Sequence, residues 1–337
     1  MNDAIWEKLE AGQDLTLDEM SGAIDEIMHG AWPDEQIARL LTGINAKGPA
    51  VDELAGAAIA MRRNMAAIRT DRTDVIDTCG TGGDGSGTFN ISTAAAIVTA
   101  AAGVPVAKHG NRSVTSKTGS ADVLAQLGVN IEATVPQIER CLNEIGICFC
   151  FAPLAHQSMR HVSAVRKSLG VPTIFNLLGP LCNPAKAQYQ LLGVGRPGMR
   201  DLMAAAVLKL GVRRAVLVTG EDGLDEVTLT GKTHATMAAG GELQKWDWSP
   251  TDFGLAVAGL ESMQVSNPEE SAAMIRRVLT KEKCPSRDIV VLNAAAAIWT
   301  AEKAASPNEA AAMAAEAIDS GAAQAKLEQL ASLSHTA

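Results

Sequence analysis

Several features that would assign the chain to a class are missing from its 337 residues. No apolar run reaches the roughly 18 residues that a membrane-spanning helix needs, and the N-terminus does not place an apolar segment after a basic one, as secretory signals do. The six cysteines form no CxxC pair, which favours reduced thiols over disulfides or a cysteine metal site. We therefore expect a cytoplasmic protein with no membrane partner.

Positive charge is also scarce. Lys and Arg number 29 while Asp and Glu number 38, so the net charge is -9 and the chain as a whole repels a phosphodiester backbone. We expect no nucleic-acid partner, and any anionic ligand must be bound by local donors. Apolar residues, by contrast, make up 47% of the chain, enough for a substantial core in one large domain or two modest ones.

The hydrophobic pattern changes along the chain. Residues 3–70 repeat apolar residues at a spacing of three to four, with Gly or Pro between the repeats, which predicts a small module of helices only. From residue 74 onward, short β-like runs alternate with helical patterns, which predicts a mostly parallel sheet flanked by helices. Residues 226–248 favour a smaller antiparallel segment, and the chain from about residue 253 favours helices again. The predicted fold class is therefore α/β, with a small helical domain and a larger α/β domain.

A glycine-rich stretch, DTCGTGGDGSGTFNIST, occupies residues 77–93, between a predicted strand and a predicted helix that starts near Ser92. Its glycines let backbone N–H groups converge on an anion, and the N-terminal end of the helix adds partial positive charge. The spacing matches neither GxGxxG nor GxxxxGKS/T, which argues against a dinucleotide fold and against a P-loop ATPase. The stretch predicts a site for a phosphate or pyrophosphate group. The glycines are Gly80, Gly82, Gly83, Gly85 and Gly87.

A second polar cluster, KHGNRSVTSKTGSADVL, covers residues 108–124 and follows the predicted strand VPVA. Because the carboxyl ends of parallel strands meet at one edge of a sheet, we expect this cluster beside the glycine-rich stretch. Its cationic and neutral donors suit several anionic oxygens at once. These donors are Lys108, Asn111, Arg112, Ser113, Ser116, Lys117 and Ser120.

Two adjacent acidic residues, Asp225 and Glu226, follow a third predicted strand within GEDGLDEVT, residues 220–228. Carboxylates are hard oxygen ligands of the kind that Mg²⁺ takes from proteins, with water and substrate phosphates completing its shell. An acidic pair that faces phosphate-binding loops needs a cation between them. We therefore expect a magnesium site here.

Taken in order, these motifs resemble those of the anthranilate phosphoribosyltransferase family. The family pattern DxCGTGGDGxxTFNxS stands at residues 77–92, and KHGNR stands at residues 108–112. Two further stretches match, VRKSLGVPTIFNLLGPLCNPA at residues 165–185 and LNAAAAIW at residues 292–299. The resemblance therefore covers nearly the whole chain.

The resemblance implies transfer of the 5-phosphoribosyl group from phosphoribosyl pyrophosphate to the amine of anthranilate in tryptophan biosynthesis, with release of pyrophosphate and with Mg²⁺ as cofactor. It implies a fold of the nucleoside phosphorylase/phosphoribosyltransferase type, with the reactants in a cleft between two domains. The helical domain would comprise residues 1–70 with a returning segment near residues 165–190, and the α/β domain residues 71–337. A homodimer formed through the helical domain is also implied.

The family's functional residues map onto this chain one by one. By resemblance, phosphoribosyl pyrophosphate is bound by Gly80, Gly82, Gly83, Asp84, Thr88, Asn90, Ser92, Lys108 and Ser120. The resemblance assigns Mg²⁺ to Ser92, Asp225 and Glu226, and anthranilate to Gly80, His109, Asn111, Arg166 and Pro180. We assign no obligate base, because an aromatic amine is already neutral at about pH 7, but His109 is a candidate for taking a late proton. This chain departs from the family pattern at one place. Where the family often has HPAM, residues 156–159 read HQSM, and this difference weakens a ligand role for His156.

Two other functions stay open at this point. A pyrimidine nucleoside phosphorylase shares the fold and also acts at carbon 1 of ribose, but it requires neither pyrophosphate nor a metal. The acidic pair Asp225–Glu226 therefore favours the transferase. A non-enzymatic relative that binds nucleic acid would need a basic surface, which the net charge of -9 argues against.

Overall fold

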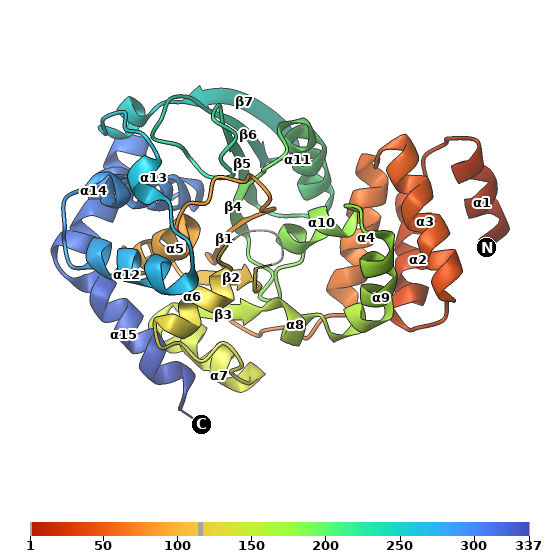
Figure 1. The fold of residues 1–337 in the computed structure, drawn as a ribbon, viewed down its shortest axis with the longest axis horizontal. Coiled ribbons are helices and arrows are strands. Elements are labelled where there is room, and N and C mark those ends of the chain that lie inside the picture. Colours follow the sequence, from red (N-terminus) through yellow and green to blue (C-terminus); the bar gives the residue numbers. More distant parts are fainter. Residues whose placement is uncertain (1, 114–116, 337) are drawn as a thin grey trace.

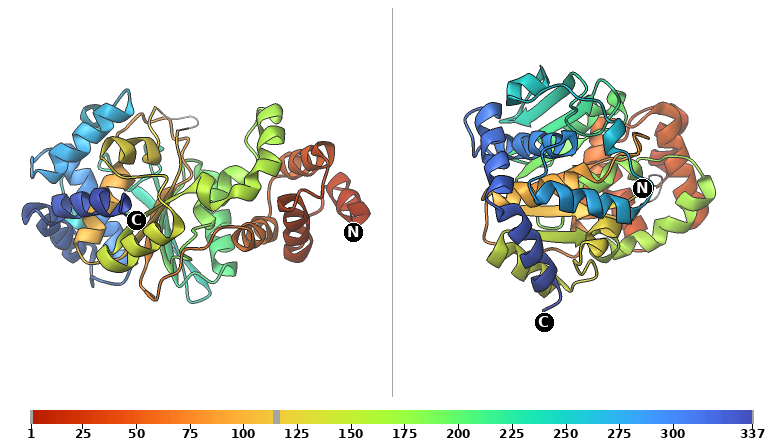
Figure 2. Two further views of the ribbon diagram at one scale, coloured as in Figure 1. Left: turned by 90° about the horizontal axis from the view of Figure 1, so that it is seen from below. Right: turned by 60° about the vertical axis from the view of Figure 1, so that its left-hand side comes forward.

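The computed structural model describes residues 2–113 and 117–336, so Ser116 of the second polar cluster lies outside the described residues. A helical module contains the N-terminus, and a larger α/β part surrounds a central sheet (Figure 1). Figure 2 shows the module at one end of an elongated molecule. The predicted fold class is confirmed.

The N-terminal module begins with the helices α1 (Asn2–Glu10), α2 (Leu17–Met28), α3 (Asp34–Lys47) and α4 (Val51–Arg63). These are the helices that the apolar spacing predicted. A capping box fixes the start of α2, because the Thr16 hydroxyl accepts from the backbone N–H of Glu19 at 3.2 Å and the Glu19 carboxylate accepts from the backbone N–H of Thr16 at 2.8 Å. Helix α2 then packs its apolar face against α4.

The central sheet has seven strands in the order β3-β2-β1-β4-β5-β6-β7. They are β1 (Ile76–Gly80), β2 (Val106–Gly110), β3 (Ile147–Phe151), β4 (Tyr189–Gly193), β5 (Arg214–Gly220), β6 (Thr233–Ala239) and β7 (Glu242–Trp248). Strands β1 to β5 pair in parallel, whereas β6 and β7 pair antiparallel. The predicted antiparallel segment is confirmed, and it extends the main sheet because β6 pairs directly with β5.

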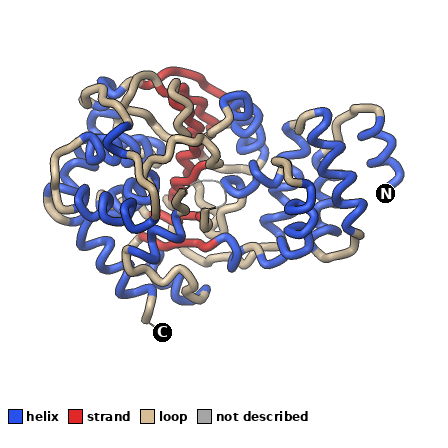
Figure 3. Tube along the Cα trace, viewed as in Figure 1, coloured by secondary structure: helices blue, strands red, loops and turns tan. Residues whose placement is uncertain are grey.

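Helices cover both faces of the sheet, as Figure 3 shows. One face packs on α5 (Ile91–Ala101), α12 (Pro268–Leu279), α13 (Pro285–Thr300), α14 (Pro307–Asp319) and α15 (Ala322–Ser334). The other face packs on α11 (Arg200–Lys209), and one apolar core joins this face, α11 and the N-terminal module. At the β3 side lie α6 (Ser120–Gln126), α7 (Val135–Arg140) and α8 (Ala152–Ala155). In the part of the chain that the structure describes, no helix is both long and apolar enough to cross a membrane.

A segment between β3 and β4 returns to the N-terminal module. It contains α9 (Arg160–Leu169) and α10 (Phe175–Leu178), whose apolar side chains belong to the same core as those of α2, α3 and α4. Backbone hydrogen bonds join the segments that connect the two parts of the molecule. Ala66 N donates to the Ala155 oxygen at 2.8 Å, and Ile68 N donates to the Pro184 oxygen at 3.0 Å. The domain division at residues 70 and 71 stays a prediction, which this packing supports.

The second polar cluster begins inside strand β2 and does not lie wholly in the loop after it. Strand β2 continues to Gly110, so Lys108 and His109 are buried strand residues and do not belong to the loop that follows. The register with β3 pairs Lys108 with Phe149 and His109 with Cys150. The neighbouring strand thus extends β2 into residues whose polar side chains do not indicate a buried strand.

Candidate active site

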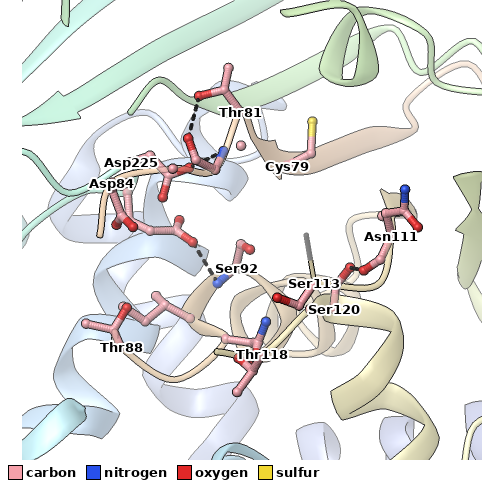
Figure 4. Close-up of a pocket in the computed structure, with 18 of the residues that line it drawn as sticks. Cys79, Thr81, Asp84, Thr88, Ser92, Asn111, Ser113, Thr118, Ser120 and Asp225 are labelled. Carbon is pink, nitrogen blue, oxygen red and sulfur yellow. Dashed lines mark hydrogen bonds between the residues drawn. The ribbon is translucent and has the colours of Figure 1, made fainter. Parts of the chain in front are cut away.

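The three predicted ligand loops line one cavity of about 320 Å³ at the carboxyl ends of the parallel strands. The glycine-rich stretch includes the end of β1 and the loop after it, the second polar cluster includes the end of β2, and the acidic pair follows β5. Figure 4 shows Asp84 and Asp225 on one side of the cavity and Asn111 and Ser120 on the other. The predicted residues among its lining are Gly80, Gly82, Gly83, Asp84, Gly87, Thr88, Asn90, Ser92, Lys108, His109, Asn111, Arg112, Ser113, Lys117, Ser120, Asp225 and Glu226, whereas Gly85 is not among them.

Close backbone approach fixes the acidic loop against two strand ends. A Cβ atom at Gly193 would lie 1.6 Å from the backbone oxygen of Asp225, and one at Gly80 would lie 2.6 Å from Asp225 Oδ2. Only glycine leaves room for the loop at these positions. With the loop this close, Asp225 Oδ2 accepts a hydrogen bond from Gly82 N at 2.8 Å. The glycine-rich stretch and the acidic pair are therefore held as one unit.

The two carboxyl groups of the acidic pair are buried and close to other acidic groups, which disfavours their ionisation. Burial, reinforced by the nearby Asp84 carboxylate, raises the pKa of Asp225 to about 7. Burial and the charge of Asp225 raise the pKa of Glu226 to about 8, although Glu226 Oε1 accepts a hydrogen bond from Ser92 N at 3.0 Å. Buried carboxyl groups that ionise only near or above neutral pH, because their charges are not offset, fit a hard divalent cation that would offset them.

This donor set fits Mg²⁺ in particular. Within residues 2–113 and 117–336, no cluster of three or more His, Cys, Asp or Glu side chains could hold a metal by itself. Mg²⁺ commonly takes one or two protein carboxylates and leaves the rest of its shell to water and phosphate oxygens. Asp225, Glu226 and the Ser92 hydroxyl beside them match that pattern.

The raised pKa values predict how stability depends on pH. Carboxylic acids whose pKa is higher in the folded than in the unfolded protein favour folding while they stay protonated, and this stabilisation is lost as pH rises through about 7 and 8. We expect the melting temperature of the metal-free protein to fall between about pH 6 and pH 8.5. Added Mg²⁺ should restore it mainly at the higher pH, which differential scanning fluorimetry measures. A melting temperature that Mg²⁺ raises equally at both pH values would contradict the assignment.

An asparagine in α13 positions the acidic pair and explains the LNAAAAIW motif. Asn293 is fully buried, its Oδ1 accepts from Val227 N at 2.9 Å, and its Nδ2 donates to the Val227 oxygen at 2.9 Å. Val227 directly follows Glu226, so this amide fixes the backbone that carries the carboxylates. Reasoning from the sequence did not identify Asn293, because a single polar residue in an alanine-rich helix gives no local signal of a partner 66 residues away.

Lys108 provides a buried positive charge under the cavity. Its Nζ donates to the Thr78 oxygen at 2.5 Å and to the Ser92 hydroxyl at 3.3 Å. Burial lowers the pKa of Lys108, against the opposing effect of the Asp77 charge. Asp77 is itself held by Asn183, whose Nδ2 donates to it at 2.7 Å. These contacts place the ammonium group beside the hydroxyl of Ser92.

Contacts on both ring nitrogens hold the His109 side chain in place. Its Nδ1 lies 3.0 Å from the Gly179 oxygen, which can only accept, so Nδ1 carries the proton and Nε2 carries the lone pair. That Nε2 lies 3.3 Å from Nε2 of His156. Burial, with the neighbouring His156 ring, lowers the pKa of His109 to about 3. The imidazole is therefore neutral and its lone pair is already engaged, which disfavours it as a proton acceptor.

Two predicted anthranilate residues do not line the cavity. Pro180 is buried, and its oxygen lies 4.0 Å from the sulfur of Cys79, a cavity residue. Arg166 lies on α9, half-buried, with its guanidinium over the Phe175 ring and 3.5 Å from Asn176 Oδ1. Within the described ranges it has no acidic partner. Arg166 is thus a partly desolvated cation without a carboxylate.

Comparison with known proteins identifies the family. The model of a "glycosyl transferase family, a/b domain" matches residues 72–324, and that of a "glycosyl transferase family, helical bundle domain" matches residues 4–65. Anthranilate phosphoribosyltransferase of Rhodopirellula baltica is 50% identical over 320 residues, which cover 95% of this chain and 94% of that protein. This chain belongs to the anthranilate phosphoribosyltransferase family.

Solved structures of the anthranilate phosphoribosyltransferase family share the whole fold. The enzyme of Thermus thermophilus has a TM-score of 0.92 and 40% identity, covering 98% of this chain and 99% of its own. The enzyme of Saccharomyces cerevisiae in complex with phosphoribosyl pyrophosphate and Mg has a TM-score of 0.89 and 28% identity, covering 99% and 97%. In complex with 4-fluoroanthranilate, the yeast enzyme has a TM-score of 0.87 and 26% identity, covering 99% and 98%. The predicted family is confirmed, and no comparison favours a nucleoside phosphorylase or a nucleic-acid binder.

Proposed function

We propose that this protein transfers the 5-phosphoribosyl group from phosphoribosyl pyrophosphate to the amine of anthranilate, giving N-(5-phosphoribosyl)anthranilate and pyrophosphate in tryptophan biosynthesis. One observation carries the proposal: the glycine-rich stretch, the donors after β2 and the acidic pair all line the same cavity. The yeast relative bound to phosphoribosyl pyrophosphate and Mg supports the choice of ligands.

The sugar substrate and the metal would bind to residues that line the cavity. We assign the diphosphate sugar to Gly80, Gly82, Gly83, Asp84, Thr88, Asn90, Ser92, Lys108 and Ser120. Ser92, Asp225 and Glu226 would hold Mg²⁺, which when bound neutralises the charge that develops on the departing pyrophosphate. The backbone N–H groups of the glycine-rich stretch and the Lys108 ammonium stabilise the same charge from the protein side.

We propose that the acceptor binds between the cavity and the returning segment, which does not itself line the cavity. We assign anthranilate to Gly80, His109, Asn111, Arg166 and Pro180. A half-buried guanidinium without an acidic partner in the described chain suits a carboxylate, because its fork donates two parallel hydrogen bonds. This pairing orients the neutral amine toward the sugar, and orientation of a nucleophile that is already unprotonated needs no strong base.

The assignment is tested by mixing anthranilate, phosphoribosyl pyrophosphate and Mg²⁺ with the full chain and following anthranilate fluorescence. The proposal predicts a loss of fluorescence that requires both the diphosphate sugar and the metal. No loss with metal present, together with cleavage of uridine in phosphate, would replace it with a nucleoside phosphorylase.

We further propose that the protein acts in the cytoplasm as a homodimer joined through the helical module. The proposal follows the family resemblance, and the small-molecule biosynthetic role supports it. Sedimentation velocity of the full chain should give twice the mass of one chain. A monomer at micromolar concentration would contradict the dimer.

A further inference from the structure

Asn90 is the N-cap residue of α5, but its side chain does not cap the helix. An asparagine at this position usually turns its carbonyl oxygen to an N–H group of the first helical turn. Here Oδ1 instead accepts from the Thr118 hydroxyl at 2.5 Å and from the Ser271 hydroxyl at 2.9 Å. The side chain is therefore held by two residues that lie far from it in the sequence.

Ser271 is a fully buried residue of α12, outside every motif that the sequence displays. Its Oγ accepts a hydrogen bond from Asn90 N at 3.0 Å. Because this oxygen is already an acceptor, its own hydrogen is available for Asn90 Oδ1. Ser271 thus engages both the backbone and the side chain of Asn90 across 181 residues of sequence.

These contacts determine which end of the amide faces the cavity. An amide has an acceptor end and a donor end, and fixing the oxygen toward Ser271 and Thr118 turns the NH₂ group away from them. Asn90 lines the cavity, and its Nδ2 makes no hydrogen bond within residues 2–113 and 117–336. Two N–H donors are therefore left for an anionic ligand, whereas the opposite orientation would present an oxygen and repel it.

We propose that Ser271 is a positioning residue that, together with Thr118, orients the Asn90 amide so that its donors face the phosphate groups of the substrate. The inference rests on the proposed function, in which Asn90 contacts the diphosphate sugar. Thr118 belongs to the loop after β2, so the same hydrogen bonds also hold that loop against the glycine-rich stretch. The effect of Ser271 should then be confined to the sugar substrate.

Steady-state kinetics of Ser271→Ala in the full chain tests the inference. We expect KM for phosphoribosyl pyrophosphate to rise about 5-fold, while kcat and KM for anthranilate stay within about twofold of the wild type. A purely structural serine would instead lower the active fraction or shift both KM values. Ser286→Ala removes another buried serine, which does not line the cavity, and should leave both KM values unchanged.

A double-mutant cycle shows whether Ser271 acts through Asn90. In the Asn90→Ala background, Ser271→Ala should raise KM for the diphosphate sugar by less than about 1.5-fold, because the amide it orients is gone. A full 5-fold rise in that background, or equal rises in both KM values, would overturn the inference. If Ser271→Ala does not fold, Thr118→Val removes the other donor and should give the same selective rise. A wild-type chain without transferase activity would instead overturn the proposed function.

Discussion

The combined change Asp225→Asn and Glu226→Gln is expected to lower kcat by on the order of 10³-fold and to remove the dependence of the remaining activity on Mg²⁺. The two amides keep the shape of the carboxylates but not the charge that a divalent cation requires. The departing pyrophosphate would then lose the charge neutralisation that the cation provides. Initial rates measured across a Mg²⁺ titration give both quantities.

A measurement of the stability of the double variant shows whether its lower kcat comes from loss of the metal site or from unfolding. Since burial and mutual charge raise the pKa values of both carboxylates, the neutral amides should leave the metal-free protein at least as stable as the wild type at about pH 8. Glu221→Gln is a matched control, because Glu221 is an exposed residue of the same loop that does not line the cavity. A double variant that keeps the wild-type response to Mg²⁺ would show that the metal binds elsewhere.

Arg166→Ala is expected to raise KM for anthranilate by about 10-fold to 100-fold, the effect of losing a charged pair of hydrogen bonds to a carboxylate. KM for phosphoribosyl pyrophosphate should change little, because Arg166 does not line the cavity that we assign to the sugar. Steady-state kinetics with each substrate varied in turn separates the two constants.

The neighbouring residue provides the control for Arg166. Lys167→Ala removes a positive charge from the same helix at an exposed position, and it should leave both KM values near those of the wild type. A similar rise in both variants would indicate a general electrostatic effect. Normal anthranilate kinetics in Arg166→Ala would mean that the acceptor binds away from the returning segment.

The positions of the ligand loops could be predicted from the sequence, because they depend on local signals. Apolar spacing separated helices from strands, and parallel strands bring the loops that follow them to one edge of the sheet. The glycine-rich stretch, the second cluster and the acidic pair therefore met in one cavity as expected. The burial of the polar end of β2 could not be predicted, since it depends on pairing with β3.

The residues that hold the site in place were not predictable in the same way. Asn293, Asn183 and Ser271 each act on a residue more than 60 positions away, at separations of 66, 106 and 181. A single polar side chain in a helix or a loop carries no sign of which distant backbone it will meet. Two of the three lie in stretches that resemble the family, but what they contact emerged only from the fold.

The burial of Arg166 could not be predicted from the sequence either. Its helix has an amphipathic pattern, and a basic residue in such a helix is usually solvated. The structure instead places its guanidinium half-buried over an aromatic ring, and burial lowers the pKa of Arg166. Among the described residues no acidic side chain pairs with this guanidinium, and only the packed structure reveals that.

Titration calorimetry of the full chain with phosphoribosyl pyrophosphate tests the central claim most directly. We expect saturable binding at one site in the presence of Mg²⁺, weaker binding by at least about 10-fold when the metal is chelated, and weak binding in both conditions for Asp225→Asn with Glu226→Gln. Absence of binding in the presence of Mg²⁺, or equal binding with and without it, would contradict a site built from the glycine-rich stretch and a cation held by the acidic pair.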